Sequence, residues 1–102
     1  MLDLASRHRE LVQEILRRTC PGATVTAFGS RTRGTATRTS DLDLVVDLGR
    51  PLGLLEIARI REAMSDSDLP MFVDIVDWHG LSETIRTEVN RSGEVLHRPT
   101  DH

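Results

Sequence analysis

The chain contains no lysine, so all 13 of its basic residues are arginine. This absence excludes the lysine of phosphate-binding P-loops, the strand lysine of protein kinases and every mechanism that needs a Schiff-base lysine. Any contact with a phosphate group must therefore come from an arginine, a backbone N–H group or a hydroxyl group.

Aromatic residues, cysteine and long apolar runs are also scarce. Aromatic residues make up 3% of the 102 residues and none is tyrosine, which argues against a base-stacking surface for single-stranded nucleic acid. A net charge of −3 argues against general binding to nucleic-acid phosphates. The single cysteine, Cys20, excludes an internal disulfide and a multi-cysteine zinc site. No uncharged apolar stretch approaches the ~20 residues that span a bilayer, and the first residues lack the apolar segment of a secretory signal, so we expect a cytoplasmic protein.

The apolar pattern predicts one domain over residues 1–102 with alternating helices and strands. Helical periodicity predicts helices over 3–19, 54–65 and 82–91. Apolar runs predict strands over 23–28, 42–48 and 71–76, and a short terminal strand fits 94–97. In the second predicted helix, the apolar residues at helical spacing, which form its predicted apolar stripe, are Leu54, Leu55, Ala58 and Met64. This order predicts an α/β (α+β) fold around a small sheet.

Two acidic residues, Asp41 and Asp43, stand two positions apart on the second predicted strand, so their carboxylates lie on one face. Their Cα atoms are then ~7 Å apart, while Leu42 and Leu44 face the core. Two like charges ~4 Å apart repel by about 4 kcal/mol at an effective dielectric constant of 20. We therefore expect either a splayed pair at a solvated strand end or a cation between the two carboxylates.

The third predicted strand contributes another acid, Asp74, between Val73 and Ile75. If the second and third strands are neighbours, Asp74 joins Asp41 and Asp43 on one face of the sheet. Three carboxylates gathered in this way match a two-metal site with ions ~3.5–4 Å apart. Because all of the ligands are oxygens, the site favours Mg²⁺ or Mn²⁺.

A glycine and a serine, Gly29 and Ser30, stand where the first predicted strand ends. Glycine permits a close approach of the backbone to a ligand, and the serine hydroxyl can cap a following helical turn whose N–H groups face an anion. Arg31 and Arg33 follow and carry positive charge. Taken alone, this segment also fits a plain connecting loop, and its spacing excludes a dinucleotide-binding fingerprint.

In combination, these elements resemble the DNA polymerase β-like nucleotidyltransferase superfamily. The matching segments are Gly29-Ser30-Arg31-Thr32-Arg33-Gly34 and Ser40-Asp41-Leu42-Asp43-Leu44. The short chain and the Gly-Ser-Arg-x-Arg-Gly form are most similar to the minimal nucleotidyltransferase (MNT) family. The resemblance covers essentially the whole chain, and Asp74 stands at the family's third acidic position.

The resemblance implies a small mixed sheet flanked by helices and a reaction that transfers AMP from ATP to an acceptor hydroxyl, releasing pyrophosphate. It also implies that Asp41 and Asp43 bind two Mg²⁺ ions, and that Asp74 binds one ion and helps activate the hydroxyl. Gly29 and Ser30 would hold the terminal phosphates of the nucleotide. Additional charge would come from Arg31 or Arg33.

The acceptor is expected to lie outside this chain. Larger relatives carry a further domain that holds the acceptor, whereas only about 25 residues follow the third predicted strand here. MNT proteins are similar to antitoxins encoded beside HEPN-domain ribonuclease toxins, which implies AMP transfer to such a toxin within a hetero-oligomer. Two alternatives remain open: an antitoxin that acts by contact alone, and a stand-alone transferase of the aminoglycoside-modifying type.

Other polar and aromatic residues have structural interpretations. Asp77 is the alternative third ligand, but three residues after Asp74 it points to the opposite face and sits by the strand end, so we expect it at the surface. We expect Asp47 to be exposed or to lie behind the metal ligands. Trp78 follows the third strand near the expected ligand edge, where it either stacks a base, binds a partner or packs under the last helix. His97 falls in a polar tail without a function. A solvated helix face or a toxin-binding face is predicted for Arg7, Arg9, Arg17 and Arg18.

Overall fold

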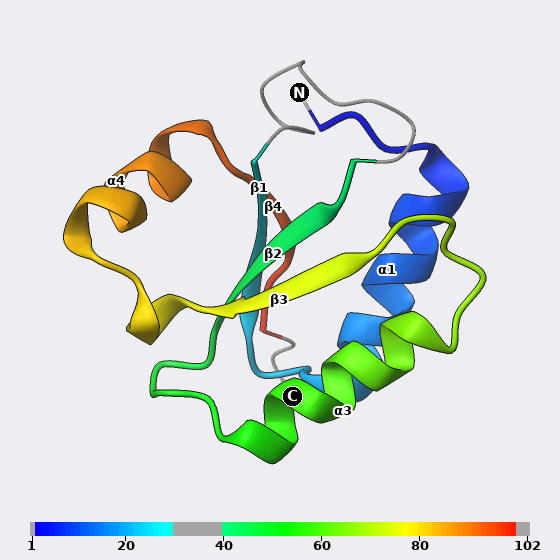
Figure 1. Cartoon of the computed structure of the whole chain (residues 1–102), viewed down its shortest axis with the longest axis horizontal. Coiled ribbons are helices and arrows are strands. Elements are labelled where there is room, and N and C mark those ends of the chain that lie inside the picture. Colours follow the sequence, from blue (N-terminus) through cyan, green and yellow to red (C-terminus); the bar gives the residue numbers. More distant parts are fainter. Residues whose placement is uncertain (1, 30–39, 100–102) are drawn as a thin grey trace.

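The computed structural model describes residues 2–29 and 40–99. In chain order these residues form α1 (Ser6–Thr19), β1 (Thr24–Phe28), β2 (Leu42–Asp47), α3 (Leu54–Ser65), β3 (Val73–Asp77), the 3₁₀ helix η1 (Trp78–Gly80), α4 (Glu83–Ser92) and β4 (Glu94–His97) (Figure 1). The predicted order of helices and strands is confirmed, including the short terminal strand. The first helix begins at Ser6 rather than at residue 3, because Ala5 has an extended backbone. The structure adds η1, which the sequence did not predict.

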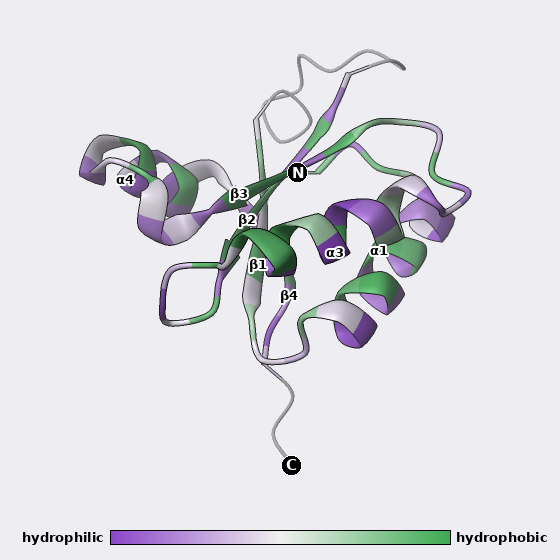
Figure 2. Cartoon of the chain, turned by 60° about the horizontal axis from the view of Figure 1, so that its bottom comes forward, coloured by the Kyte–Doolittle hydropathy of each residue, from purple (hydrophilic) through white to green (hydrophobic). Residues whose placement is uncertain are grey.

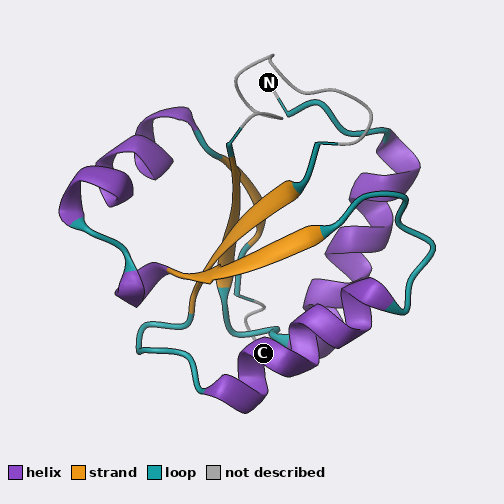
Figure 3. Ribbon diagram, viewed as in Figure 1, coloured by secondary structure: helices purple, strands orange, loops and turns teal. Residues whose placement is uncertain are grey.

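The strands form a four-stranded mixed sheet in the order β3-β2-β1-β4. β1 is antiparallel to both β2 and β4, whereas β2 and β3 are parallel. Helices α1 and α3 lie side by side on one side of the sheet, and α4 lies on the other side (Figures 2 and 3). The predicted small mixed sheet flanked by helices is therefore confirmed. None of the described helices is long and apolar enough to cross a membrane.

The core lies between the sheet and the α1–α3 layer, and β2 shows why. Its alternate residues Leu42, Leu44 and Val46 are fully buried, because residues two apart on a strand point to the same face. Asp43 and Asp47 point to the opposite face and are partly exposed. The sheet thus has a helix-covered face and a more open face, and the acidic residues of β2 lie on the open face.

The apolar stripe predicted for α3 is wrong at three of its four positions. Leu54 and Leu55 are 86% and 81% exposed and Ala58 is also exposed, whereas the buried side chains of the helix are Ile60 and Met64. At about 100° per residue, Ile57, Ile60 and Met64 share one side of the helix, and Leu54, Leu55 and Ala58 lie roughly 90–170° away from it. The first turn of α3 therefore presents an apolar surface to solvent (Figure 2).

His97 does not lie in a polar tail, so that prediction is also wrong. It is the last residue of β4, only 7% exposed, and its Nδ1 lies 2.9 Å from the backbone oxygen of Ala23. The short terminal strand places this histidine against the end of the core, near the buried Cys20 and Ala23. Burial also raises the pKa of the Cys20 thiol, which therefore stays protonated near neutral pH.

One ion pair ties the start of the chain to β4. Glu94 accepts hydrogen bonds from the Arg9 guanidinium on α1 and, over 3.1 Å, from the backbone N–H of Leu2. Of the four arginines assigned to a solvated helix face, Arg9 is thus paired across elements, while Arg7, Arg17 and Arg18 are exposed as predicted. The Arg9 guanidinium and the Leu2 N–H lower the pKa of the Glu94 carboxyl.

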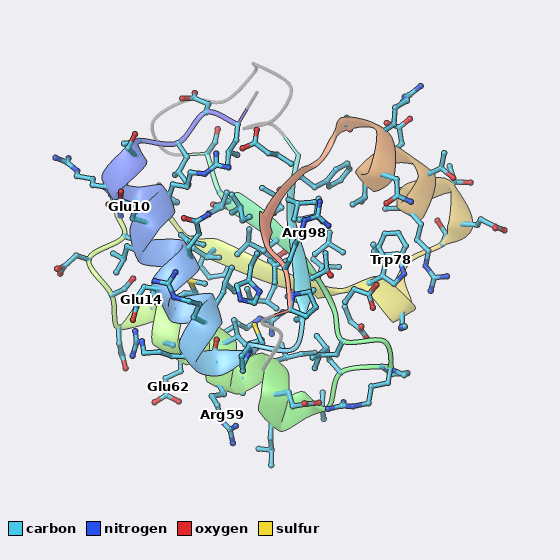
Figure 4. All side chains as sticks on the ribbon, turned by 180° about the vertical axis from the view of Figure 1, so that it is seen from behind. Glu10, Glu14, Arg59, Glu62, Trp78 and Arg98 are labelled. Atoms are coloured by element: carbon cyan, nitrogen blue, oxygen red, sulfur yellow. The ribbon has the colours of Figure 1, made fainter. Side chains whose placement is uncertain are left out.

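We expect Glu94→Gln to lower the free energy of unfolding by up to about 1 kcal/mol at pH 7, because the pair is partly exposed. The pKa of the Glu94 carboxyl is lower in the folded protein than in the unfolded chain, where it is about 4.5. The ionised carboxylate therefore stabilises the fold fully above pH 4.5, and this stabilisation is lost as the pH falls through the lower pKa of the folded protein. Urea unfolding at pH 7 and in strong acid measures the difference, which should vanish in acid. Glu10→Gln, at an exposed α1 position (Figure 4), is the control and should leave the free energy of unfolding unchanged at both pH values. A pH-independent effect of Glu94→Gln would contradict the assignment.

Candidate active site

Two of the predicted site acids, Asp43 and Asp74, are neighbours in the sheet. They are the second residues of β2 and β3 and pair directly in the parallel register. Adjacent strands are about 4.8 Å apart, so the two side chains leave the same face at nearly the same place. The backbone N–H of Leu42 donates to the oxygen of Phe72 over 2.9 Å, which fixes the register where both strands begin. Both carboxylates are partly exposed, as a ligand-binding pair requires.

The third predicted acid, Asp41, directly precedes β2 and is exposed. As they stand, no three of the described histidine, cysteine, aspartate and glutamate side chains gather closely enough to hold a metal ion. The backbone nevertheless aligns Asp43 with Asp74, and carboxylate oxygens are the donors that Mg²⁺ prefers. The donor set of these residues therefore fits a divalent cation.

Gly29 packs directly against Asp43. It follows β1, whose last residue, Phe28, pairs with Asp43 across the antiparallel register. Its φ of +98° is a conformation that residues with a side chain rarely adopt, and a Cβ atom here would lie 2.5 Å from Oδ2 of Asp43. Glycine is therefore needed both for the backbone turn and for the space that the Asp43 carboxylate occupies.

Three of the residues predicted to bind the nucleotide, Ser30, Arg31 and Arg33, lie outside the residues that the structure describes. Gly29, which directly precedes them, is buried and lies against Asp43. The described part of the chain therefore places the start of the predicted phosphate-binding segment beside the β2–β3 acids.

Arg61 of α3 also lies at this site and was not predicted from the sequence. Its Nη2 lies 3.6 Å from Oδ1 of Asp74 and donates a 3.2 Å hydrogen bond to the backbone oxygen of Ile75. Arg61 thus passes around the free edge of β3 and connects α3 with the open face. No sequence motif marks this residue, because its position depends on how α3 packs along β3.

The other two strand acids have structural roles. Asp77 accepts hydrogen bonds from the backbone N–H of His79, over 3.1 Å, and of Leu52, over 3.2 Å, so it caps η1 and holds the turn before α3. Asp47 accepts from the backbone N–H of Gly49 over 2.8 Å, and His79 Nε2 lies 3.6 Å from its Oδ1. Both residues stabilise loops at the far ends of β2 and β3.

Trp78 is not near the candidate ligand edge, so that expectation is wrong. Since β2 and β3 are parallel, Asp43 and Asp74 lie where both strands begin, whereas Trp78 follows the last residue of β3. Trp78 stands four positions after Asp74, which corresponds to about 13 Å along a strand. The Arg86 guanidinium of α4 instead lies over the Trp78 ring, 5.3 Å from its centre, so Trp78 packs beside the last helix (Figure 4). It is therefore not available beside the acids to stack a base.

Comparisons with known proteins identify the family and the fold. The family model "Polymerase beta, Nucleotidyltransferase" matches residues 10–101. A Haemophilus influenzae protein named "Probable protein adenylyltransferase MntA" is 43% identical over 90 residues, covering 88% of this chain and 79% of that protein. A solved structure described as a minimal nucleotidyltransferase is 39% identical with a TM-score of 0.67, covering 85% of this chain and 87% of that one. A solved toxin–antitoxin structure with AMP-PNP is 26% identical with a TM-score of 0.75, covering 90% and 74% of the two chains.

Proposed function

The chain belongs to the polymerase beta nucleotidyltransferase family, and we propose that it transfers AMP from ATP to a hydroxyl group of a HEPN-domain ribonuclease toxin, which it thereby neutralises. The observation that carries this proposal is the parallel pairing of Asp43 with Asp74 beside Gly29. The MntA relative is named as a protein adenylyltransferase, and a similar fold occurs in a toxin–antitoxin complex with an ATP analogue. Both support this choice of nucleotide and partner.

In the proposed reaction, the acceptor oxygen attacks the α-phosphorus of ATP. The bond from that phosphorus to the bridging oxygen of the β-phosphate breaks, and pyrophosphate leaves. Asp74, which is partly exposed at the edge of the sheet, orients the acceptor hydroxyl and draws its proton. Holding the two reactants in line accounts for much of the acceleration, because it converts a bimolecular step into an effectively unimolecular one.

The metal ligands in this proposal are Asp41, Asp43 and Asp74, with Asp41 and Asp43 shared by two Mg²⁺ ions and Asp74 binding one. When bound, divalent ions neutralise the charge that develops on the phosphate oxygens. Gly29, Ser30, Arg31 and Arg33 hold the phosphates of the nucleotide. Residues 1–102 act as one minimal nucleotidyltransferase domain, and we place the reaction in the cytoplasm, where ATP is the available donor.

Labelled ATP tests the proposal. The chain and Mg²⁺ are incubated with the HEPN-domain protein proposed as its partner and with ATP labelled at either the α- or the γ-phosphate. We expect label on the HEPN protein from α-labelled ATP only, together with loss of its ribonuclease activity. Neutralisation without any transfer of label would contradict the proposal and support an antitoxin that acts by contact. Label that passes to a small alcohol and not to the HEPN protein would support a small-molecule transferase.

A further inference from the structure

A groove lies between the second half of α3 and the start of β3, which we call the α3–β3 groove. Its volume is about 370 Å³, and its lining includes Met64, Leu69, Met71, Phe72, Arg61 and Glu62. The Phe72 side chain is 64% exposed, which is unusual for a large aromatic side chain. The groove is therefore an apolar depression with an exposed aromatic wall and two charged residues.

The groove lies next to the candidate active site. Phe72 and Val73 line it and directly precede Asp74 in the chain. Arg61 belongs to both places, because it lines the groove and its Nη2 lies 3.6 Å from the Asp74 carboxylate. β3 is an edge strand, and among the described residues no further strand pairs with its outer side. A molecule that occupies the groove can therefore reach around this edge to Asp74.

The surroundings of the groove are acidic. Glu62 lines the groove, and Asp66 and Asp68 follow α3 in the segment that leads to Leu69 of the lining. Glu62, Asp66 and Asp68 are exposed, and Figure 4 shows Glu62 on the outside of α3. An occupant with an apolar side chain next to lysine or arginine is thus complementary to the groove in both polarity and charge.

We propose that the acceptor protein docks in the α3–β3 groove by inserting an apolar side chain, flanked by basic residues, against Phe72. This inference rests on the proposed function and specifies how the partner is held. Apolar side chains that fill a pocket carry a large share of the affinity of protein interfaces, and complementary charges around them speed association. Docking there anchors the partner beside Asp74 while its hydroxyl reaches the open face.

Phe72→Ser removes the aromatic wall without changing the backbone oxygen that pairs with Leu42. We expect at least a tenfold rise in both the dissociation constant for the purified HEPN partner and the KM for that partner. The KM for ATP and the kcat at saturating partner should stay within twofold of wild type. Leu55→Ser is the matched control, because Leu55 is 81% exposed on the same helix but does not line the groove, and it should leave all four values unchanged.

A second variant tests the charge complementarity. Asp66→Asn combined with Asp68→Asn should slow association with the partner several-fold at low salt and leave little difference at high salt.

Unchanged partner affinity in both the Phe72 and the Asp66/Asp68 variants would overturn the inference, as would equal losses of affinity for Phe72→Ser and Leu55→Ser. A chain whose own dimer dissociates on Phe72→Ser would show that the groove binds a second copy instead. If wild type binds the partner without transferring AMP, the proposed function fails, and the affinity comparison still decides where the partner docks.

Discussion

Replacing Asp43 with asparagine is expected to reduce AMP transfer by about 10³-fold or more while leaving the fold intact. Asparagine keeps the size of the side chain but removes the negative charge with which Asp43 is proposed to hold a divalent cation. Asp43 is also the central acid of the site, since it pairs with Asp74 on one side and lies against Gly29 on the other. The loss is therefore expected in kcat, with the dissociation constant for the HEPN partner unchanged.

Asp47→Asn is the matched control for this variant. Asp47 lies on the same strand and the same face, four residues further along, and it bonds to the backbone of Gly49 rather than to the site. Transfer in this control should stay within about threefold of wild type, because its distance from Asp74 removes it from the chemistry. Radiolabel transfer and thermal unfolding are measured for both proteins. Equal losses in the two variants, or a toxin still fully neutralised by Asp43→Asn, would contradict the catalytic assignment.

Gly29→Ala is expected to be nearly as severe, for two separate reasons. A residue with a side chain at a positive φ costs about 1–2 kcal/mol, so the free energy of unfolding should fall by that amount. The new Cβ atom would also lie 2.5 Å from Oδ2 of Asp43, and the carboxylate must move away. A displacement of about 1 Å at a reacting centre can reduce the rate by about 10²-fold, which is the loss of AMP transfer that we expect.

Gly49→Ala separates the two effects. Gly49 also has a positive φ, of +78°, but it is exposed and a Cβ atom there meets no atom within 4 Å. This control should lose the same 1–2 kcal/mol of stability and retain its transferase activity. Chemical denaturation and initial rates at saturating ATP provide the comparison. If both alanine variants lose activity in proportion to stability, Gly29 serves the fold alone and does not shape the site.

The pairing of the acids could be predicted because it depends on local patterns. Asp43 and Asp74 each interrupt an apolar strand, and the two-residue period of a strand assigns them to the face opposite Leu44 and Ile75. That β2 and β3 are neighbours was a condition of the prediction, and the structure supplies both this adjacency and the register that pairs Asp43 with Asp74. The close contact between Gly29 and Asp43 fits the expected role of glycine, although its positive φ could not be derived from the sequence.

Features that depend on how elements rotate and pack could not be predicted. The sequence contains apolar residues on two sides of α3, and packing against α1 and β3 decides that Ile60 is buried and Leu55 exposed. The same rotation brings Arg61 to Asp74, which no local pattern indicates. His97 was misassigned because a four-residue strand near the end of the chain has too little pattern to identify its buried side.

The most direct test of the account is a structure of this chain with Mg²⁺ and AMP-PNP. We expect carboxylate oxygens of Asp41, Asp43 and Asp74 at about 2.0–2.1 Å from the ions, with the α-phosphate beside Asp74 and the terminal phosphates next to Gly29. An AMP-PNP complex in which Asp74 makes no contact with metal, or in which the ions lie beside Asp47 and His79 at the opposite ends of β2 and β3, would contradict the account.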